Sequence, residues 1–318
     1  MEKTRQQKIQ EKIAEIRKYK FFDPTYDPVF KKIFRNKQNL IYFLNAVLHL
    51  EGEHRVKSVV HLKPAIKLRN QAEKGKRISF DIHARTMCGK YIDVEMQRAS
   101  QEDFLDRIEF YSTLLSVNAK LTMDAEITAK RRKEHPYLMP TVYSIWICNF
   151  NVPFCDGFHE EIALFRASDV GKANPLTIYP KKRYIIIDLT KYVPQKVHSL
   201  ESQWIELFRN LPMAKDVPQG IDRSVRAAYR QLLVAKAKDK FVTEVATGMI
   251  DRDEYNACIS YARNKGRAEG HAKGLAEGEK RGETRAKRKF AARDSLRVKY
   301  LRSQKIPASV ISAMLAIK

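Results

Sequence analysis

Two neighbouring segments of the chain, residues 78–86 and 91–97, alternate strictly between apolar and polar residues. In each segment the apolar positions share one parity: Ile78, Phe80, Ile82 and Ala84 in the first, Ile92, Val94 and Met96 in the second. A period of two is typical of a β-strand with one buried face. Gly89 lies between the two segments. The pattern therefore predicts an antiparallel hairpin.

The surrounding segments predict an α/β fold. Apolar residues recur at helical spacing in residues 3–20, 27–50 and 101–119. Short apolar runs predict further strands at residues 56–62, 141–148 and 183–189, and from about residue 200 the chain turns helical. The predicted order is helix, three strands, helix, strand and a further strand.

The C-terminal region carries a repeat in which glycine recurs every four residues, at Gly266, Gly270, Gly274, Gly278 and Gly282. Residues 262–318 hold 16 Lys+Arg and 5 Asp+Glu, a net charge of +11. Glycine lowers helix stability by about 1 kcal/mol per position, so this helix is weak alone. The repeat has three interpretations: a solvated linker helix, a surface for self-association, or a segment that contacts the DNA backbone. Residues 290–318 predict two helices joined by a turn, with Pro307 at the start of the second.

Composition restricts the class of protein. The 318 residues are 44% hydrophobic, which is enough for a core and excludes wholesale disorder. The chain lacks a long apolar run and opens on a polar segment, so neither a membrane span nor a secretory signal is expected. The four cysteines show no metal-type spacing and suggest a reducing, cytoplasmic setting. A net charge of +23 favours a polyanion, nucleic acid above all, over an ordinary basic surface or acidic lipid.

The register of the hairpin decides which acidic residues meet. A two-residue turn at residues 88–89 would pair residue 82 with Glu95, whereas a three-residue loop at 87–89 pairs Asp81 with Glu95. The longer loop suits Gly89 and leaves both apolar stripes on one face. Two carboxylates about 5 Å apart repel unless a cation or a proton lies between them. If a cation lies there, oxygen ligands suit Mg²⁺ or Mn²⁺. The alternative is that the polar face of the hairpin is simply exposed to water.

These segments together resemble a known family. Asp81 followed by Glu95-Met96-Gln97 resembles the core motif of the PD-(D/E)XK nucleases. The chain is more closely similar to the recombination-promoting nuclease and transposase family of bacteria within that superfamily, over most of residues 20–200 and more loosely in the tail. The stretches that carry the likeness are residues 26–34, 43–48, 80–84 and 93–97, with Arg107 before Phe110-Tyr111 and the basic Glu-Gly repeats of the tail.

The resemblance implies a restriction-endonuclease-like core and a metal-dependent DNA endonuclease that promotes recombination. Asp81 and Glu95 would bind Mg²⁺ or Mn²⁺, and Gln97 stands where the superfamily usually has a lysine and this family has glutamine. Glutamine supplies no charge but would orient water. Asp27 would be a further metal ligand or simply a helix cap before Pro28.

The supporting residues have two interpretations each. Lys31 or Lys90 would supply the missing positive charge and contact DNA. Arg107 would contact a phosphate or pair with Asp103. Asp93 would support the metal ligands. His83 shares their face and is expected to be structural.

The expected organisation has four segments: a charged helix at residues 1–20, a nuclease-like domain at 21–200, a helical region at 201–261 and the basic tail at 262–318. Homo-oligomers would form through the C-terminal helical region, and the expected location is the bacterial cytoplasm. The rival function is a DNA-binding accessory protein of a mobile element that does not cleave. An RNA-binding scaffold is a third, disfavoured because the tail holds only two aromatic residues, Phe290 and Tyr300.

Overall fold

The computed structural model describes residues 3–63, 65–67, 77–100, 102–194 and 198–316. The chain forms two compact units, residues 1–250 and 251–318. Within the described residues, no helix combines the length and the apolar character that crossing a membrane requires.

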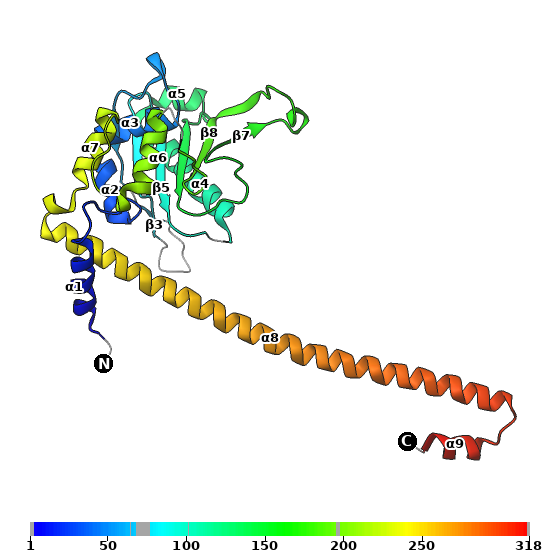
Figure 1. Cartoon of the computed structure of the whole chain (residues 1–318). Coiled ribbons are helices and arrows are strands. Elements are labelled where there is room, and N and C mark those ends of the chain that lie inside the picture. Colours follow the sequence, from blue (N-terminus) through cyan, green and yellow to red (C-terminus); the bar gives the residue numbers. More distant parts are fainter. Residues whose placement is uncertain (1–2, 64, 68–76, 101, 195–197, 317–318) are drawn as a thin grey trace. The chain divides into compact units, whose positions relative to one another are not determined.

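A six-stranded mixed sheet forms the centre of the first unit (Figure 1). Its strands lie in the order β1 (Val59–His61), β4 (Ile82–Thr86), β5 (Tyr91–Gln97), β6 (Val142–Cys148), β8 (Thr177–Asp188) and β7 (His159–Phe165). β1, β4 and β5 pair antiparallel, whereas β5, β6 and β8 run parallel. A separate hairpin of β2 (Ala65–Lys67) and β3 (Arg77–Ser79) lies between β1 and β4 in the chain.

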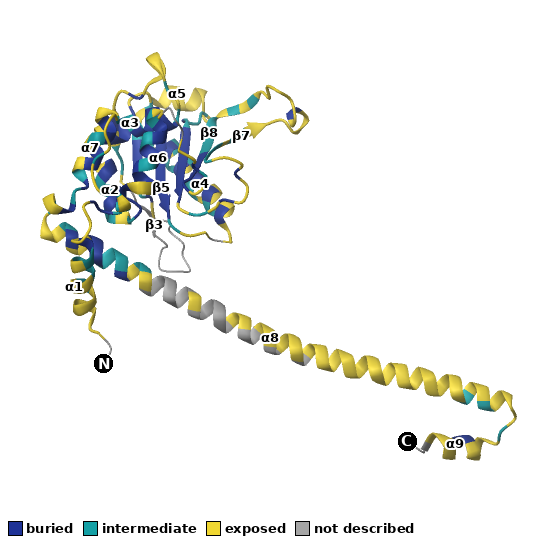
Figure 2. Cartoon of the chain, viewed as in Figure 1, coloured by how far each residue is buried: buried dark blue, intermediate teal, exposed yellow. Residues whose placement is uncertain are grey.

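Helices cover both faces of this sheet. On one face α2 (Asp27–Arg35), α3 (Lys37–Val47), α6 (Leu200–Asn210) and α7 (Arg223–Gln231) pack with the sheet around one large apolar core. On the other face α4 (Phe104–Glu126) packs on β5 and β6. β5 and β6 are therefore buried along their whole length, as the dark blue strands in Figure 2 show.

This arrangement confirms the predicted α/β fold: a helix, a three-strand meander, a helix and a strand in that order, with a helical C-terminus. The hairpin of β4 and β5 has the predicted three-residue loop, because the register pairs Ile82 with Val94 and Arg85 with Tyr91. Gly89 has φ +76°, the left-handed conformation that such a loop requires at its last position. Extended by one residue, this register places Asp81 opposite Glu95.

Two element predictions need correction. The helix expected at residues 27–50 is two helices, because Asn36 ends α2 and its side chain caps α3 by accepting from the Gln38 amide. The strand expected at 78–86 is interrupted at residues 80–81, since β3 pairs with β2 rather than with the main sheet. As a result Phe80 packs under α4 with Tyr91, whereas Ile82 lies in the core on the opposite face. Strict alternation would place both on one face.

The remaining elements extend these two units. The sequence pattern did not predict β7 at the sheet edge or the short helix α5 (Ala129–Glu134). The N-terminal helix α1 (Arg5–Ile16) begins at a capping box made by Thr4 and Gln7. Helix α8 (Asp239–Ser303) begins in the first unit, where Val242, Val245 and Ala246 are buried. The second unit continues α8 to residue 303 and ends in α9 (Ala308–Ala316) after Pro307, as the predicted two-helix pattern requires.

Candidate active site

The carboxylates of Asp81 and Glu95 each accept a hydrogen bond from a backbone amide across the hairpin. The Asp81 amide donates to Glu95 Oε1 at 2.9 Å, and the Met96 amide donates to Asp81 Oδ2 at 3.0 Å. Each carboxylate thus has one oxygen fixed on the neighbouring strand. The second oxygen of each, Asp81 Oδ1 and Glu95 Oε2, is not used in these bonds. The hairpin register is therefore what brings the two acids together.

A third acid, Asp93, lies beside them on the same face of β5. Its residue is fully buried, and among the described residues no N–H or hydroxyl group donates to its carboxylate oxygens; its hydrogen-bonding neighbour is the Glu95 carboxyl, when one of the two acids carries a proton. Glu95 is also buried, at 2% exposure. The polar face of the hairpin, which the alternation suggested would be open to solvent, is covered by α4. Burying charges without partners is strongly unfavourable, so this face requires a proton or a cation.

The pKa values of all three acids reflect this burial. Loss of water raises the pKa of Asp81 to about 6, with the negative charge of Asp27 adding to the effect. Burial likewise raises the pKa of Asp93 well above its usual range. The pKa of Glu95 is raised for the same reason, and the charges of Asp93 and Asp81 raise it further. Three acids whose charged forms are disfavoured in one place are a common mark of a functional site.

Asp27 and Lys31 reach the same place from α2. Lys31 Nζ lies 2.6 Å from Asp27 Oδ1 and 3.6 Å from Asp81 Oδ1. Burial opposes the charge of Lys31, but the neighbouring carboxylates of Asp27, Asp81 and Glu95 outweigh it and raise its pKa. Asp27 is not the helix cap that its place before Pro28 suggested, because α2 starts at Asp27 itself and Tyr26 precedes it as the N-cap residue. The structure therefore brings both sequence-selected residues of α2 to Asp81.

Gln97 and Lys90 lie at opposite ends of β5. Gln97 Nε2 is 3.5 Å from Glu95 Oε2, so the amide lies on the same face as the acids. Lys90 precedes the strand and its ammonium group lies 5.6 Å from the centre of the Tyr143 ring. Five residues of extended chain, about 16 Å, separate Lys90 from Glu95. Of the two lysines considered as the source of positive charge, only Lys31 lies at the acids.

Arg107 approaches the acidic face from α4. Its guanidinium lies 5.2 Å from the centre of the Tyr111 ring and 5.9 Å from that of Trp146. The charge of Arg107 acts on Asp93, partly offsetting the effect of burial on the pKa of that acid. Trp146 is the register partner of Glu95 on β6, so Arg107 lies over the sheet close to the acids.

His83 is hydrogen-bonded within the fold, as expected for a structural histidine. Its Nδ1 bonds to the Lys63 carbonyl at 3.0 Å, and burial lowers its pKa. It is the register partner of Asp93.

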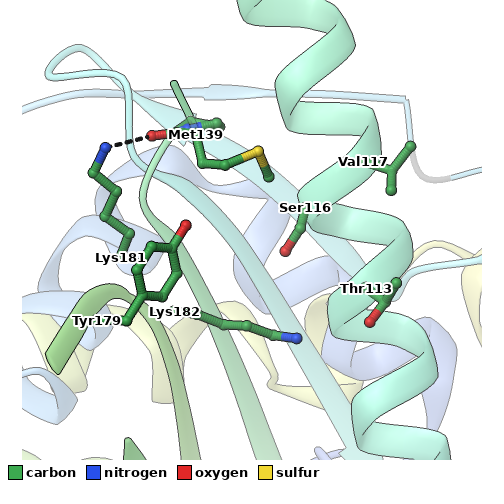
Figure 3. Close-up of a pocket in the computed structure, with 8 residues that line it drawn as sticks. Thr113, Ser116, Val117, Met139, Tyr179, Lys181 and Lys182 are labelled. Carbon is green, nitrogen blue, oxygen red and sulfur yellow. Dashed lines mark hydrogen bonds between the residues drawn. The ribbon is translucent and has the colours of Figure 1, made fainter. Parts of the chain in front are cut away.

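Two features of the first unit lie apart from these acids. A pocket of about 280 Å³ beside α4 is lined by Thr113, Ser116, Tyr179, Lys181 and Lys182, among others (Figure 3). Lys181 donates to the Met139 carbonyl and Lys182 pairs with Glu109, so both ammonium groups are already bonded within the protein. The second feature is a cluster of His49, His159 and Glu201. Sequence reasoning missed it because its members are far apart in the chain and follow no motif.

A comparison with protein families puts these residues in context. A family model described as PD-(D/E)XK nuclease family transposase matches residues 24–246. No curated protein and no solved structure matches the chain. The matched range contains Asp27, Lys31 and the whole hairpin, and it supports the resemblance drawn from the sequence. Because it spans more than half of the 318 residues, the chain belongs to the PD-(D/E)XK nuclease family transposases.

Proposed function

We propose that this chain is a divalent-metal-dependent DNA endonuclease that hydrolyses phosphodiester bonds and so promotes recombination or the transfer of a mobile element. The observation that carries the proposal is the pairing of Asp81 with Glu95 beside the fully buried carboxyl group of Asp93. Membership of a nuclease family and a net charge of +23 support DNA as the substrate. A protein with this substrate is expected in the bacterial cytoplasm.

The donor set fits Mg²⁺ or Mn²⁺. Asp81 and Glu95 each retain one carboxylate oxygen that is not bound to the backbone, and Asp27 adds a carboxylate next to Asp81. Hard oxygen ligands of this kind suit these ions. An ion held there would polarise the scissile phosphate and lower the pKa of water to give a hydroxide nucleophile.

The chain's own polar residues would then position the substrate and the water. Lys31 supplies the positive charge that Gln97 cannot, and its ammonium group would stabilise the phosphate as its charge develops. The Gln97 amide would orient the attacking water. Arg107 and Lys90 would contact phosphates of the duplex, which fixes its position without reading its sequence.

The second unit would add affinity. Its basic charge suits contact with the DNA backbone, and its glycine-rich helix is the segment through which copies of the chain would associate. Neither role requires a catalytic residue in that unit. The acids of the candidate active site all lie in the first unit, residues 1–250.

The test is cleavage of supercoiled plasmid by the purified full chain. With Mg²⁺ or Mn²⁺ the expected products are nicked and linear DNA, and none is expected in EDTA. Plasmid that is bound but remains intact with either ion would refute cleavage and favour the accessory protein. Binding of RNA in preference to DNA would favour the scaffold.

A further inference from the structure

Three polar side chains from distant parts of the chain converge in the first unit, apart from the acidic site. His49 follows the end of α3, His159 begins β7 and Glu201 lies in the first turn of α6. His49 Nε2 is 2.9 Å from Glu201 Oε2, and His159 Nδ1 is 2.5 Å from Glu201 Oε1. The two imidazole rings stack, with centres 5.1 Å apart. The ligand atoms of all three side chains lie within 4.8 Å of one another.

The position of His49 is set by the end of α3. His49 has φ +48°, and Lys305 is the only other described residue besides glycine with a positive φ. The left-handed conformation costs a residue with a side chain on the order of 1 kcal/mol or more. The Leu50 amide donates to the Asn45 carbonyl at 3.0 Å and the His49 amide to the Ala46 carbonyl at 3.4 Å, so the left-handed residue is part of the hydrogen-bonded turn that ends α3. Beyond this turn the ring of His49 lies with its Nε2 2.9 Å from Glu201 Oε2.

The donor set selects the class of ion. Two imidazole nitrogens and one carboxylate oxygen are the ligands of a borderline transition metal such as Zn²⁺, whereas Mg²⁺ requires oxygen ligands. Three protein ligands leave a fourth tetrahedral position for water. The His49 side chain is 66% exposed, so that position is open to solvent, while the Glu201 carboxylate is 9% exposed and fixed at the helix start.

We propose that His49, His159 and Glu201 form a Zn²⁺ site that joins the end of α3, the start of β7 and the start of α6. The site is separate from Asp81, Asp93 and Glu95, whose oxygen ligands suit a different ion. Its role is to stabilise the folded first unit, because an ion that binds only the folded chain adds to its stability by mass action.

The experiment uses the full chain without a polyhistidine tag, freed of metal with EDTA and then dialysed into a large excess of Mg²⁺. Zn²⁺ binding is measured by titration calorimetry. Wild type should bind one Zn²⁺ per chain, and His49→Asn and His159→Ala should bind none. The control His54→Ala removes an exposed histidine from the loop after α3 and should still bind one.

His49→Asn is the decisive variant, because asparagine tolerates the left-handed conformation and the exposed position leaves the core unchanged. Saturating Zn²⁺, at 100 times its dissociation constant, should raise the Tm of wild type by about 5 °C or more and that of His49→Asn by none. Co²⁺ in place of Zn²⁺ should give the visible absorption of a four-coordinate site. Asp81→Asn and Glu95→Gln should bind Zn²⁺ as wild type does, which separates this site from the nuclease proposal.

Zn²⁺ binding that is absent in wild type, or unchanged in His49→Asn, would overturn the proposal. The three side chains would then be a hydrogen-bonded cluster that holds no ion.

Discussion

Burial of Asp81 disfavours the charged carboxylate that metal binding requires, so stability and the proposed chemistry make opposite demands on this residue. Its pKa is raised from 3.8 in the unfolded chain to about 6 in the folded chain, mainly by burial. Between these values the folded state binds more protons than the unfolded state, so the free energy of unfolding decreases as the pH rises through this window. The contribution is complete below pH about 4 and is on the order of 3 kcal/mol.

Asp81→Asn should remove this dependence. Without divalent metal, the variant should match wild type near pH 4 and be more stable than wild type above pH 6.5. Urea unfolding across this range in EDTA checks the prediction. Asp294→Asn makes the same charge change at an exposed position of α8 and should follow wild type. If Asp81→Asn and wild type give the same pH profile, Asp81 is not held in the environment described here.

Lys31 should matter for catalysis more than for folding. Lys31→Met keeps the length of the side chain but removes the charge 3.6 Å from Asp81. Removing one such electrostatic interaction typically lowers the rate about 100-fold, and DNA affinity should change little. Plasmid cleavage rates and filter binding measure the two effects. Lys37→Met, at an exposed lysine of α3, is the control, and an equal reduction of rate in both variants would show that Lys31 contributes only general charge.

At the scale of elements, the hairpin of β4 and β5 depends on the conformation of Gly89. A side chain there meets no neighbouring atom but must adopt φ +76°. Gly89→Ala should therefore lower the free energy of unfolding by about 1–2 kcal/mol through the backbone alone. Gly157→Ala, where the added carbon only makes ordinary contact with the His159 carbonyl at 3.9 Å, should have a smaller effect. Chemical denaturation of both variants gives the comparison, and equal stability of the two would contradict the loop assigned here.

The sequence was sufficient for this hairpin because its determinants are local. Alternation, loop length and Gly89 together predicted the register that pairs Asp81 with Glu95. The break at Phe80 and Asp81 was not predictable, because it depends on β3 pairing with β2 outside the main sheet. The alternation also could not show that α4 covers the polar face, since burial on both sides of β5 depends on a helix that follows it in the chain.

The residues of the candidate site could be predicted from the sequence where they belong to a short motif. Asp81, Glu95 and Gln97 follow a short pattern, and Asp27 and Lys31 lie in the matching helix. Asp93 was assigned only a supporting role, although it is the most deeply buried of the acids. His49, His159 and Glu201 carry no motif, and their meeting depends on the packing of three elements far apart in the chain.

At the scale of the whole molecule, the second unit should supply affinity without chemistry. Deleting residues 262–318 removes a net charge of +11 but leaves the first unit, residues 1–250, intact. DNA binding should weaken. The slope of log K against log salt should decrease by about 0.9 for each phosphate that the shortened chain no longer neutralises, while cleavage persists at high protein concentration. An unchanged salt slope would exclude the tail as a DNA-binding segment, and comparing the solution masses of both forms would then test self-association.

The rate of plasmid cleavage by Glu95→Gln with Mn²⁺ in excess decides whether Asp81 and Glu95 form the active site. Glutamine has the same shape, and burial already favours a neutral group at this position, so the variant should fold as wild type does. It cannot supply the negative oxygen that a metal site at Asp81 and Glu95 requires. We expect cleavage to fall below detection, while Glu53→Gln, at an exposed glutamate, cleaves at the wild-type rate. Cleavage by Glu95→Gln at the rate of wild type would contradict the assignment of the active site.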